Sequence, residues 1–215
     1  MMSQALKSRR EIEEDARKEH ILSIAESLFA EHGLIDTSMA DIAKDAEFGV
    51  GTIYKYFKDK NTLVQSLLES RLDAHFDEID EALDSKGTPV ELIERVIDAH
   101  LASVARRHLF FKIYYTHFHP GTLDGYSGYT DALDHTFMHN RKKKMLKSIR
   151  AVFHKGAATG LFIGLNPSFL TAALFGMLIS FCFLDEHTAE GDRDLAAKQA
   201  ALKKILFDAV RVETK

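Results

Sequence analysis

Proline is rare in this chain, and its distribution constrains the fold more than any other feature of the sequence. The 215 residues contain three prolines, Pro89, Pro120 and Pro167, each beside residues that favour turns. Between them, apolar residues recur at every third or fourth position, and no stretch shows the period of two that is typical of strands. The sequence therefore predicts an all-α fold.

Apolar spacing and capping residues together place the expected helices. Ser38 precedes one helix with Asp41 three positions later, and Thr88 and Glu91 form a similar pattern around Pro89. The sequence predicts helices at about residues 16–32, 39–46, 50–57, 61–84, 89–106, 109–118, 129–157, 167–186 and 194–212.

The segment GVGTIYKYFKDK, residues 49–60, combines aromatic and basic residues on one short helix. At about 100° per residue, Val50, Ile53 and Phe57 fall on one side of this helix. Because lysine pairs with phosphate, and tyrosine contacts phosphates, sugars and base edges, the other side suits the major groove of DNA. Tyr54 lies at the border of that side, which carries Gly51, Thr52, Lys55 and Tyr56.

A very short helix precedes this segment and completes a familiar arrangement. With Ser38 as its N-cap, the helix at 39–46 would direct free backbone N–H groups and the positive end of its dipole towards a phosphate. A short helix, a tight turn and a second helix form a helix-turn-helix. The sequence therefore predicts a DNA-binding function for this part of the chain.

Residues 37–63, TSMADIAKDAEFGVGTIYKYFKDKNTL, resemble the DNA-binding signature of the TetR family of transcriptional regulators, and ILSIAESLFAEHG upstream extends the resemblance. The resemblance implies a three-helix DNA-binding domain at 1–62, followed by a larger helical ligand-binding and dimerisation domain at 63–215. It implies that Thr37 and Ser38 contact phosphates, that Tyr54 and Lys60 clamp the DNA backbone, and that the groove is faced by Gly51, Thr52, Lys55 and Tyr56.

Two residues depart from the common family pattern. Glu47 stands where a turn glycine is usual, so we expect its backbone to avoid a positive φ. Gly49 stands where a serine often caps the recognition helix, a change that costs only a few tenths of a kcal/mol. The fold should tolerate both residues, but Gly49 has no hydroxyl with which to make the phosphate contact that such a serine could make.

The resemblance also implies a homodimer that binds a palindromic double-stranded DNA operator, as a repressor, and responds to a small-molecule effector. A cluster of aromatic residues would line an apolar effector cavity or form ordinary core: Phe110, Tyr114, Phe118, Phe137 and Phe153. The last two helices are the candidates for dimerisation, through Phe169, Ala172, Ala173, Gly176, Ile179, Phe183, Leu202, Ile205, Leu206 and Ala209.

Charge and composition limit the remaining possibilities. The net charge is −4 and the pI is near 6.3, so any basic surface for DNA must be local. The single cysteine, Cys182, and the absence of a secretory leader at the start predict a cytoplasmic protein. The apolar run at 169–184 is too short to span a bilayer, so we expect a buried helix and no membrane partner.

Three local features have two interpretations each. The run RKKKMLKSIR, residues 141–150, is expected to be a solvated helix face, or a phosphate site if Lys144 or Arg150 points inward. The start of the chain is expected to be disordered, or else a basic arm for a minor groove through Lys7, Arg9 and Arg10. The histidines at 117, 119, 135 and 139 have spacings that permit a metal, but no carboxylate or cysteine pattern accompanies them.

We therefore expect no metal, no cofactor and no enzymatic activity. An enzyme would need an assembled acid, base and nucleophile, and the sequence offers none. The alternative to a DNA-binding regulator is a small-molecule carrier whose DNA-binding head has lost its function. That alternative is motivated by Glu47, by Gly49, and by the nine basic against twelve acidic residues of segment 1–64.

Overall fold

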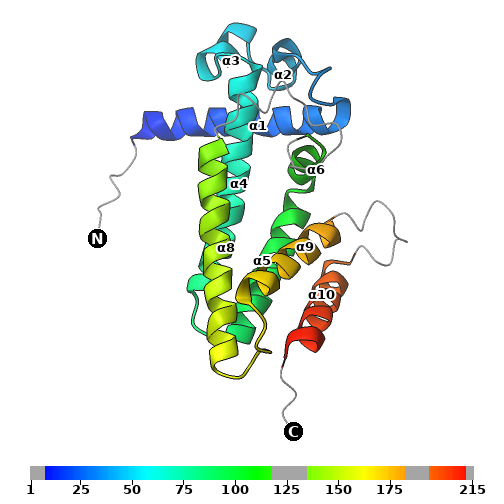
Figure 1. Ribbon diagram of the computed structural model, residues 1–215. Helices are drawn as coiled ribbons and strands as arrows, with labels where there is room; N and C mark the ends of the chain where they lie inside the picture. The colour runs from blue at the N-terminus through cyan, green and yellow to red at the C-terminus, as the bar shows by residue number, and fades with distance from the viewer. Residues whose placement is uncertain (1–7, 118–134, 183–193, 212–215) are drawn as a thin grey trace. The chain divides into compact units, whose positions relative to one another are not determined.

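The computed structural model describes residues 8–117, 135–182 and 194–211. These residues are almost entirely helical, and within the described ranges the one β-type contact is an isolated bridge between Phe162 and Arg211 (Figure 1). The prediction of an all-α fold is confirmed. The helices are α1 (Arg9–His32), α2 (Met39–Asp45), α3 (Val50–Tyr56), α4 (Lys60–Asp84), α5 (Pro89–Arg106), α6 (His108–His117), α8 (His135–Ala158), α9 (Pro167–Cys182) and α10 (Leu195–Val210).

Capping residues explain where several of these helices begin. Ser38 and Thr88 cap α2 and α5 through reciprocal bonds with Asp41 and Glu91, as the sequence predicted. Ser8 caps α1 in the same way through the residue three positions on, which moves the start of α1 to Arg9. The prediction that this helix begins near residue 16 was wrong, because it relied on apolar spacing and the first two turns of α1 are exposed.

The basic start of the chain is therefore partly helical rather than an extended arm. Arg9 and Arg10 lie in the first turn of α1, and each pairs with a glutamate one turn later, at 3.0 Å for Glu13 and 3.5 Å for Glu14. Lys7 lies outside the described residues. The interpretation of Arg9 and Arg10 as part of a disordered segment or a flexible arm is corrected accordingly.

The chain forms two compact units, and α4 contributes to both. The first unit comprises Met1–Arg71 and Leu109–Asp134, and the second comprises Leu72–His108 and His135–Lys215. The predicted domains, 1–62 and 63–215, remain a proposal about function. The boundary between the two compact units lies inside α4, after Arg71.

In the first unit, α1, α2, α3 and the start of α4 share a small core. The most deeply buried side chains in it include Ile21, Ala25, Ile42, Ile53 and Phe57. Arg71 of α4 adds a polar tie at its edge, because its guanidinium pairs with Glu19 at 2.5 Å and Glu26 at 2.8 Å, both on α1. This core fixes the positions of α2 and α3 relative to α1.

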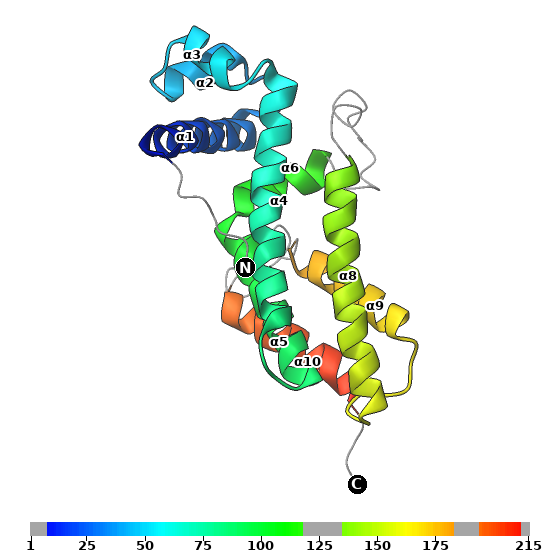
Figure 2. The same ribbon diagram turned by 90° about the vertical axis from the view of Figure 1, so that its left-hand side faces the viewer.

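In the second unit, α5 packs against α8, α9 and α10, and α8 packs along α9, as both views show (Figure 2). Phe162, in the loop between α8 and α9, has its ring between those of Phe153 and Phe207, with centroids at 5.5 Å and 6.4 Å. A side chain at position 156 would overlap the Phe162 ring, so Gly156 is required for this close approach. The loop is thereby packed firmly against the C-terminal end of α8.

The apolar helix α9 is only half buried within a single chain. Leu170, Leu174 and Leu178 face the core, while Phe169 is 70% exposed. The prediction of a buried helix therefore holds, within a single chain, for the face that carries the three leucines. Among the dimerisation candidates whose side chains are described, the buried ones are Leu202 and Leu206, which belong to the core of their own chain; the exposed ones are Phe169, Ala172, Ala173, Gly176, Ile205 and Ala209.

None of the helices in the described parts of the chain is both long and apolar enough to cross a membrane.

Candidate nucleic-acid interface

The exposed side of α3 matches the face predicted from the sequence. Ile53 and Phe57 are fully buried, whereas Gly51, Tyr54 and Lys55 are exposed, and Thr52 and Tyr56 are intermediate. Within the part of the chain that the structure describes, Lys55 makes no ion pair. A side chain at Gly51 would meet nothing within 4 Å, so this position is open to solvent. The helix thus presents hydroxyls, aromatic rings and an unneutralised ammonium on one surface.

Val50 is exposed, although the helical projection places it on the same side as Ile53 and Phe57. It is 43% exposed and is the first residue of α3. A helical projection treats every turn as equally supported, so it could not distinguish the first turn from the second. Val50 adds an apolar side chain suited to contact with a thymine methyl group.

The N-terminus of α2 is built around Ser38. Its Oγ accepts from the Asp41 N–H at 3.2 Å, while the Asp41 carboxylate accepts from the Ser38 N–H at 2.9 Å and hydroxyl at 2.6 Å. The bonds from the Ser38 side chain and backbone lower the pKa of Asp41. Both residues are exposed, so the hydroxyl of Ser38 lies where a phosphate could approach.

The side chain of Thr37 lies inside the turn rather than on the surface. This side chain is buried, and its hydroxyl donates to the Gly33 carbonyl at 2.8 Å. In this conformation the side chain of Thr37 is therefore not available for the predicted phosphate contact. Thr37 instead closes the turn between α1 and α2, where Gly33 has a φ of 86°.

Lys60, at the start of α4, joins this turn to the recognition region. Its ammonium donates to the Ile35 carbonyl at 3.2 Å. Burial lowers the pKa of Lys60, and the charge of Asp36 partly offsets this effect. A backbone phosphate would compete with a neutral carbonyl for this ammonium, so the predicted role of Lys60 is compatible with its position.

The turn between α2 and α3 contains the largest departure from expectation. Glu47 has a φ of 57°, the left-handed conformation that the sequence analysis expected it to avoid. Two bonds hold the turn there: Phe48 N–H to Ala43 O at 2.9 Å, and Glu47 N–H to Lys44 O at 3.1 Å. This is the Schellman pattern, which normally ends in glycine.

A histidine of α1 supports the same turn from below. The Nε2 of His20 lies 3.3 Å from the Ala46 carbonyl oxygen, and its ring meets that of Phe48 edge to face at 5.9 Å. Gly49 then caps α3 without any side-chain bond, as predicted. The turn is therefore held by backbone bonds and by α1 rather than by a capping hydroxyl.

The five predicted effector-binding residues are only partly described. In the first unit, Phe110 is fully buried and contacts Phe111 and Tyr114, with centroids 5.1 Å and 6.0 Å away. In the second unit, Phe153 is fully buried against Phe162. Phe118 and the side chain of Phe137 lie outside the described residues, as do the side chains of the four predicted histidines and Cys182. The effector cavity at these residues remains a prediction.

The fold and this surface define a helix-turn-helix protein. Residues 21–67 match the family model for bacterial regulatory proteins of the tetR family. The resemblance to the TetR family of transcriptional regulators, expected from residues 37–63, is confirmed for this part of the chain.

Similar proteins agree with this assignment. Over 147 residues, 68% of each chain, the sequence is 28% identical to the HTH-type transcriptional repressor KstR2 of Mycolicibacterium smegmatis. It is 32% identical to the fatty acid metabolism regulator protein of Bacillus subtilis over 88 residues, which cover 41% of this chain and 45% of that one.

The fold is shared over nearly the whole length with solved structures. The ketosteroid transcriptional regulator KstR2 of Mycobacterium tuberculosis has a TM-score of 0.71 at 21% identity, covering 99% of this chain and 100% of that one. AibR in complex with isovaleryl coenzyme A and operator DNA has a TM-score of 0.71 at 21% identity, covering 90% and 99%.

Proposed function

We propose that this protein is a ligand-responsive repressor that binds a palindromic operator as a homodimer and leaves it when a small effector binds. The observation that carries the proposal is the exposed side of α3, where Tyr54 and Lys55 stand on a helix that is anchored from behind by the buried Ile53 and Phe57. A rigid helix with one unneutralised lysine and exposed hydroxyls suits reading of the major groove.

Dimerisation is supported by the apolar residues that a single chain leaves exposed. Phe169, Gly176 and the two alanines between them are exposed on α9, and Ile205 is 53% exposed on α10. A two-fold contact through such a surface is isologous, so it would present two copies of α3 to successive major grooves. Half-sites in that arrangement lie about 34–36 Å apart.

The effector would act through α4, because this helix runs without interruption from the first unit into the second. Its 25 residues span about 37 Å at 1.5 Å per residue. We consider two states that differ in the position of α4, one of which binds the operator better. An effector that binds one state more tightly shifts the operator-binding free energy by that difference, typically about 1–3 kcal/mol. AibR, which shares this fold, has been solved with an acyl thioester and operator DNA together.

The test is selection of bound duplexes from a random DNA library, followed by fluorescence anisotropy on the winning sequence over a range of salt. We expect an inverted repeat. Lys55→Ala should weaken binding about tenfold and reduce the salt slope by about one, with no loss of stability. Tyr54→Ala should also weaken binding, while Lys143→Ala, an exposed lysine of α8, serves as the matched control.

The carrier alternative predicts a different outcome of the same experiment. A head that no longer binds DNA gives no enriched sequence at low salt, and Lys55→Ala then changes nothing. Ligand binding by the second unit would persist.

A further inference from the structure

The charged residues of α8 all carry positive charge. Residues His135–Ala158 include seven lysines and arginines and no acidic residue, and Pro167–Cys182 of α9 includes no charged residue at all. Arg141 and Lys144 are neutralised within the second unit by three aspartates of α4. Arg141 pairs with Asp73, Asp77 and Asp80 at 3.2, 2.5 and 3.5 Å, and Lys144 pairs with Asp80 at 2.7 Å.

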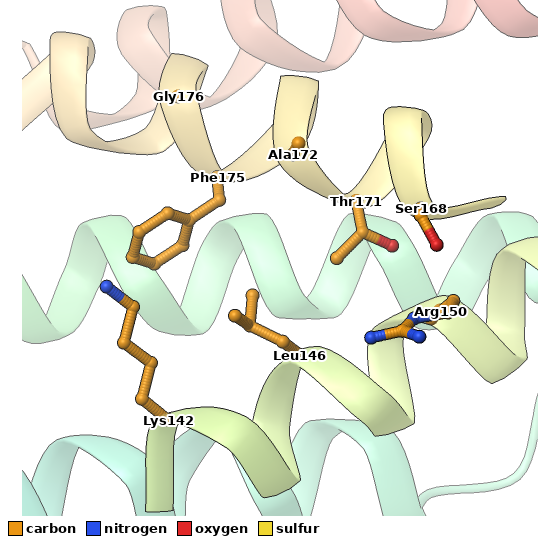
Figure 3. Close-up of a pocket in the computed structure, with 8 residues that line it drawn as sticks. All are labelled: Lys142, Leu146, Arg150, Ser168, Thr171, Ala172, Phe175 and Gly176. Carbon is orange, nitrogen blue, oxygen red and sulfur yellow. The ribbon is translucent and has the colours of Figure 1, made fainter. Parts of the chain in front are cut away.

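Two other cations of α8 line a groove between α8 and α9. Lys142 and Arg150 stand at its ends with Leu146 between them, each four residues from the next and therefore on one face of the helix (Figure 3). Eight residues of helix correspond to about 12 Å along the axis. The cavity measures about 350 Å³ and is completed by Ser168, Thr171, Ala172, Phe175 and Gly176 of α9.

Lys142 is a half-buried cation without a carboxylate among the described residues. Burial lowers the pKa of Lys142, and its ammonium lies 4.7 Å from the centre of the Phe175 ring. Arg150 is exposed, and it too makes no ion pair in the described ranges. Since desolvating a cation is costly unless it is paired, an anion that enters the groove gains both an ion pair and apolar contact.

A second copy of the chain does not supply that anion through the same helices. Neither α8 nor α9 has an acidic residue within its bounds, so a copy packed through them brings more positive charge to Lys142 and Arg150. Helix α10, the other helix proposed for dimerisation, has one acidic residue, Asp208, which pairs with Lys204 of its own helix. Ala172 and Gly176 border both the groove and the surface proposed for dimerisation, so a small molecule of opposite charge would lie beside that contact.

We propose that the groove between α8 and α9 binds an elongated apolar molecule bearing a carboxylate, which pairs with Lys142 while its chain lies over Leu146 and Phe175. One ammonium balances the single charge of a carboxylate, whereas a phosphate monoester carries about −1.5 to −2. Arg150, at the far end, takes a second carboxylate where the ligand has one.

The position of the groove also suggests what an occupant does. Lys142 follows Arg141 directly on α8, so a ligand that draws in Lys142 acts beside the ion pairs that join α8 to α4. The idea that this molecule is the effector rests on the proposed function. The idea that it binds in the groove is independent of that function.

Calorimetric titration of the full chain with decanedioate, decanoate and decanol tests the site. We expect decanedioate to bind most tightly, decanoate next, and decanol about tenfold more weakly than decanoate. Lys142→Met keeps the apolar stem over Phe175 and should weaken decanoate about tenfold. Lys143→Met removes an exposed neighbouring charge and should leave binding unchanged.

Failure to bind either acid, equal affinity for decanol, or unchanged binding by Lys142→Met would overturn the proposal. So would a change of oligomeric mass in Lys142→Met, measured by light scattering, because it would show that the groove is a contact between copies. Operator anisotropy separates this result from the proposed function. If the protein binds an operator but no acid, only the proposal for the groove is rejected. If it binds the acid but enriches no operator, only the proposal of a DNA-binding regulator is rejected.

Discussion

Two lysine-rich segments of this protein look alike in sequence and behave differently in the structure. In segment 49–60, Lys55 is exposed and unpaired within the described residues, and it stands on a short helix held from behind by apolar side chains. In segment 141–150, Arg141 and Lys144 are neutralised by aspartates of α4. The difference shows that the role of a basic segment depends on whether acidic residues of a neighbouring helix pair with its cations.

The prediction that segment 141–150 is a solvated face is confirmed for four of its six cations and is wrong for Arg141 and Lys142. The side chain of Arg141 is only 20% exposed, its guanidinium also lies over the Phe76 ring at 5.7 Å, and Lys142 is half-buried. Lys144 does not line the groove, since its ammonium reaches Asp80. The expected solvated face is formed by the exposed cations Lys143, Lys144, Lys147 and Arg150.

The strongest test of this contrast is Arg141→Met. We expect the free energy of unfolding to fall by about 2–3 kcal/mol, because carboxylates of α4 lose their partner and the effect is reduced by the exposure of Asp73 and Asp77. Urea denaturation measures the change. Lys55→Met, its counterpart on α3, should stay within about 0.5 kcal/mol of the parent. Equal effects of the two substitutions would remove the distinction between the segments.

Acid should affect the second unit through a buried histidine. His75 of α4 lies 2.9 Å from the Ser103 hydroxyl of α5, and its ring contacts that of His100. Burial, with a smaller contribution from the charge of Arg107, lowers the pKa of His75 from 6.5 to about 3. Between these values the unfolded chain binds a proton that the folded chain does not, so stability falls as the pH falls.

At pH 5.5 this loss is about 1.3 kcal/mol relative to pH 7. His75→Gln keeps a hydrogen-bonding group near Ser103 and should reduce the difference in urea midpoint between pH 7 and pH 5.5. His32→Gln replaces an exposed histidine of α1 and should not. If both variants retain the pH dependence of the parent, His75 is not its source.

The smallest expected effect concerns the backbone of the first unit. Among the described non-glycine residues, Glu47 is the one with a positive φ. Glu47→Gly should raise the free energy of unfolding by about 1 kcal/mol, because the strain of a left-handed residue exceeds the added entropy of glycine in the unfolded chain. Asp45→Gly, within α2, should instead lower it by about 0.5–1 kcal/mol. A loss of stability in Glu47→Gly would contradict the assigned strain.

Local signals account for the parts that the sequence predicted correctly. Capping boxes act over three residues, so Ser38 and Thr88 could be placed from the sequence alone, and burial of Ile53 and Phe57 followed from helical spacing. The exposure of Val50 and the inward hydroxyl of Thr37 depend on contacts from other helices. No local pattern contains that information.

The groove was missed for a related reason. Seven cations on one helix give many possible partners, and the sequence cannot tell which of them face the aspartates of α4 and which face α9. Attention to aromatic residues instead favoured Phe153, which is buried and does not line this groove. The groove was identified by asking which cations of α8 pair with a carboxylate and which do not. The number of aromatic residues nearby did not identify it.

The close fit of Phe162 against Gly156 has a mechanical consequence for α8. With its C-terminal end held against this ring and, through it, against Phe153 and Phe207, that end of the helix has little room to shift. Tilting of α8 must therefore pivot there, and displacement grows with distance from the pivot. Arg141 lies fifteen residues from Gly156, about 22 Å along the helix. A small change of angle at the pivot becomes a movement of whole ångströms where α8 holds α4.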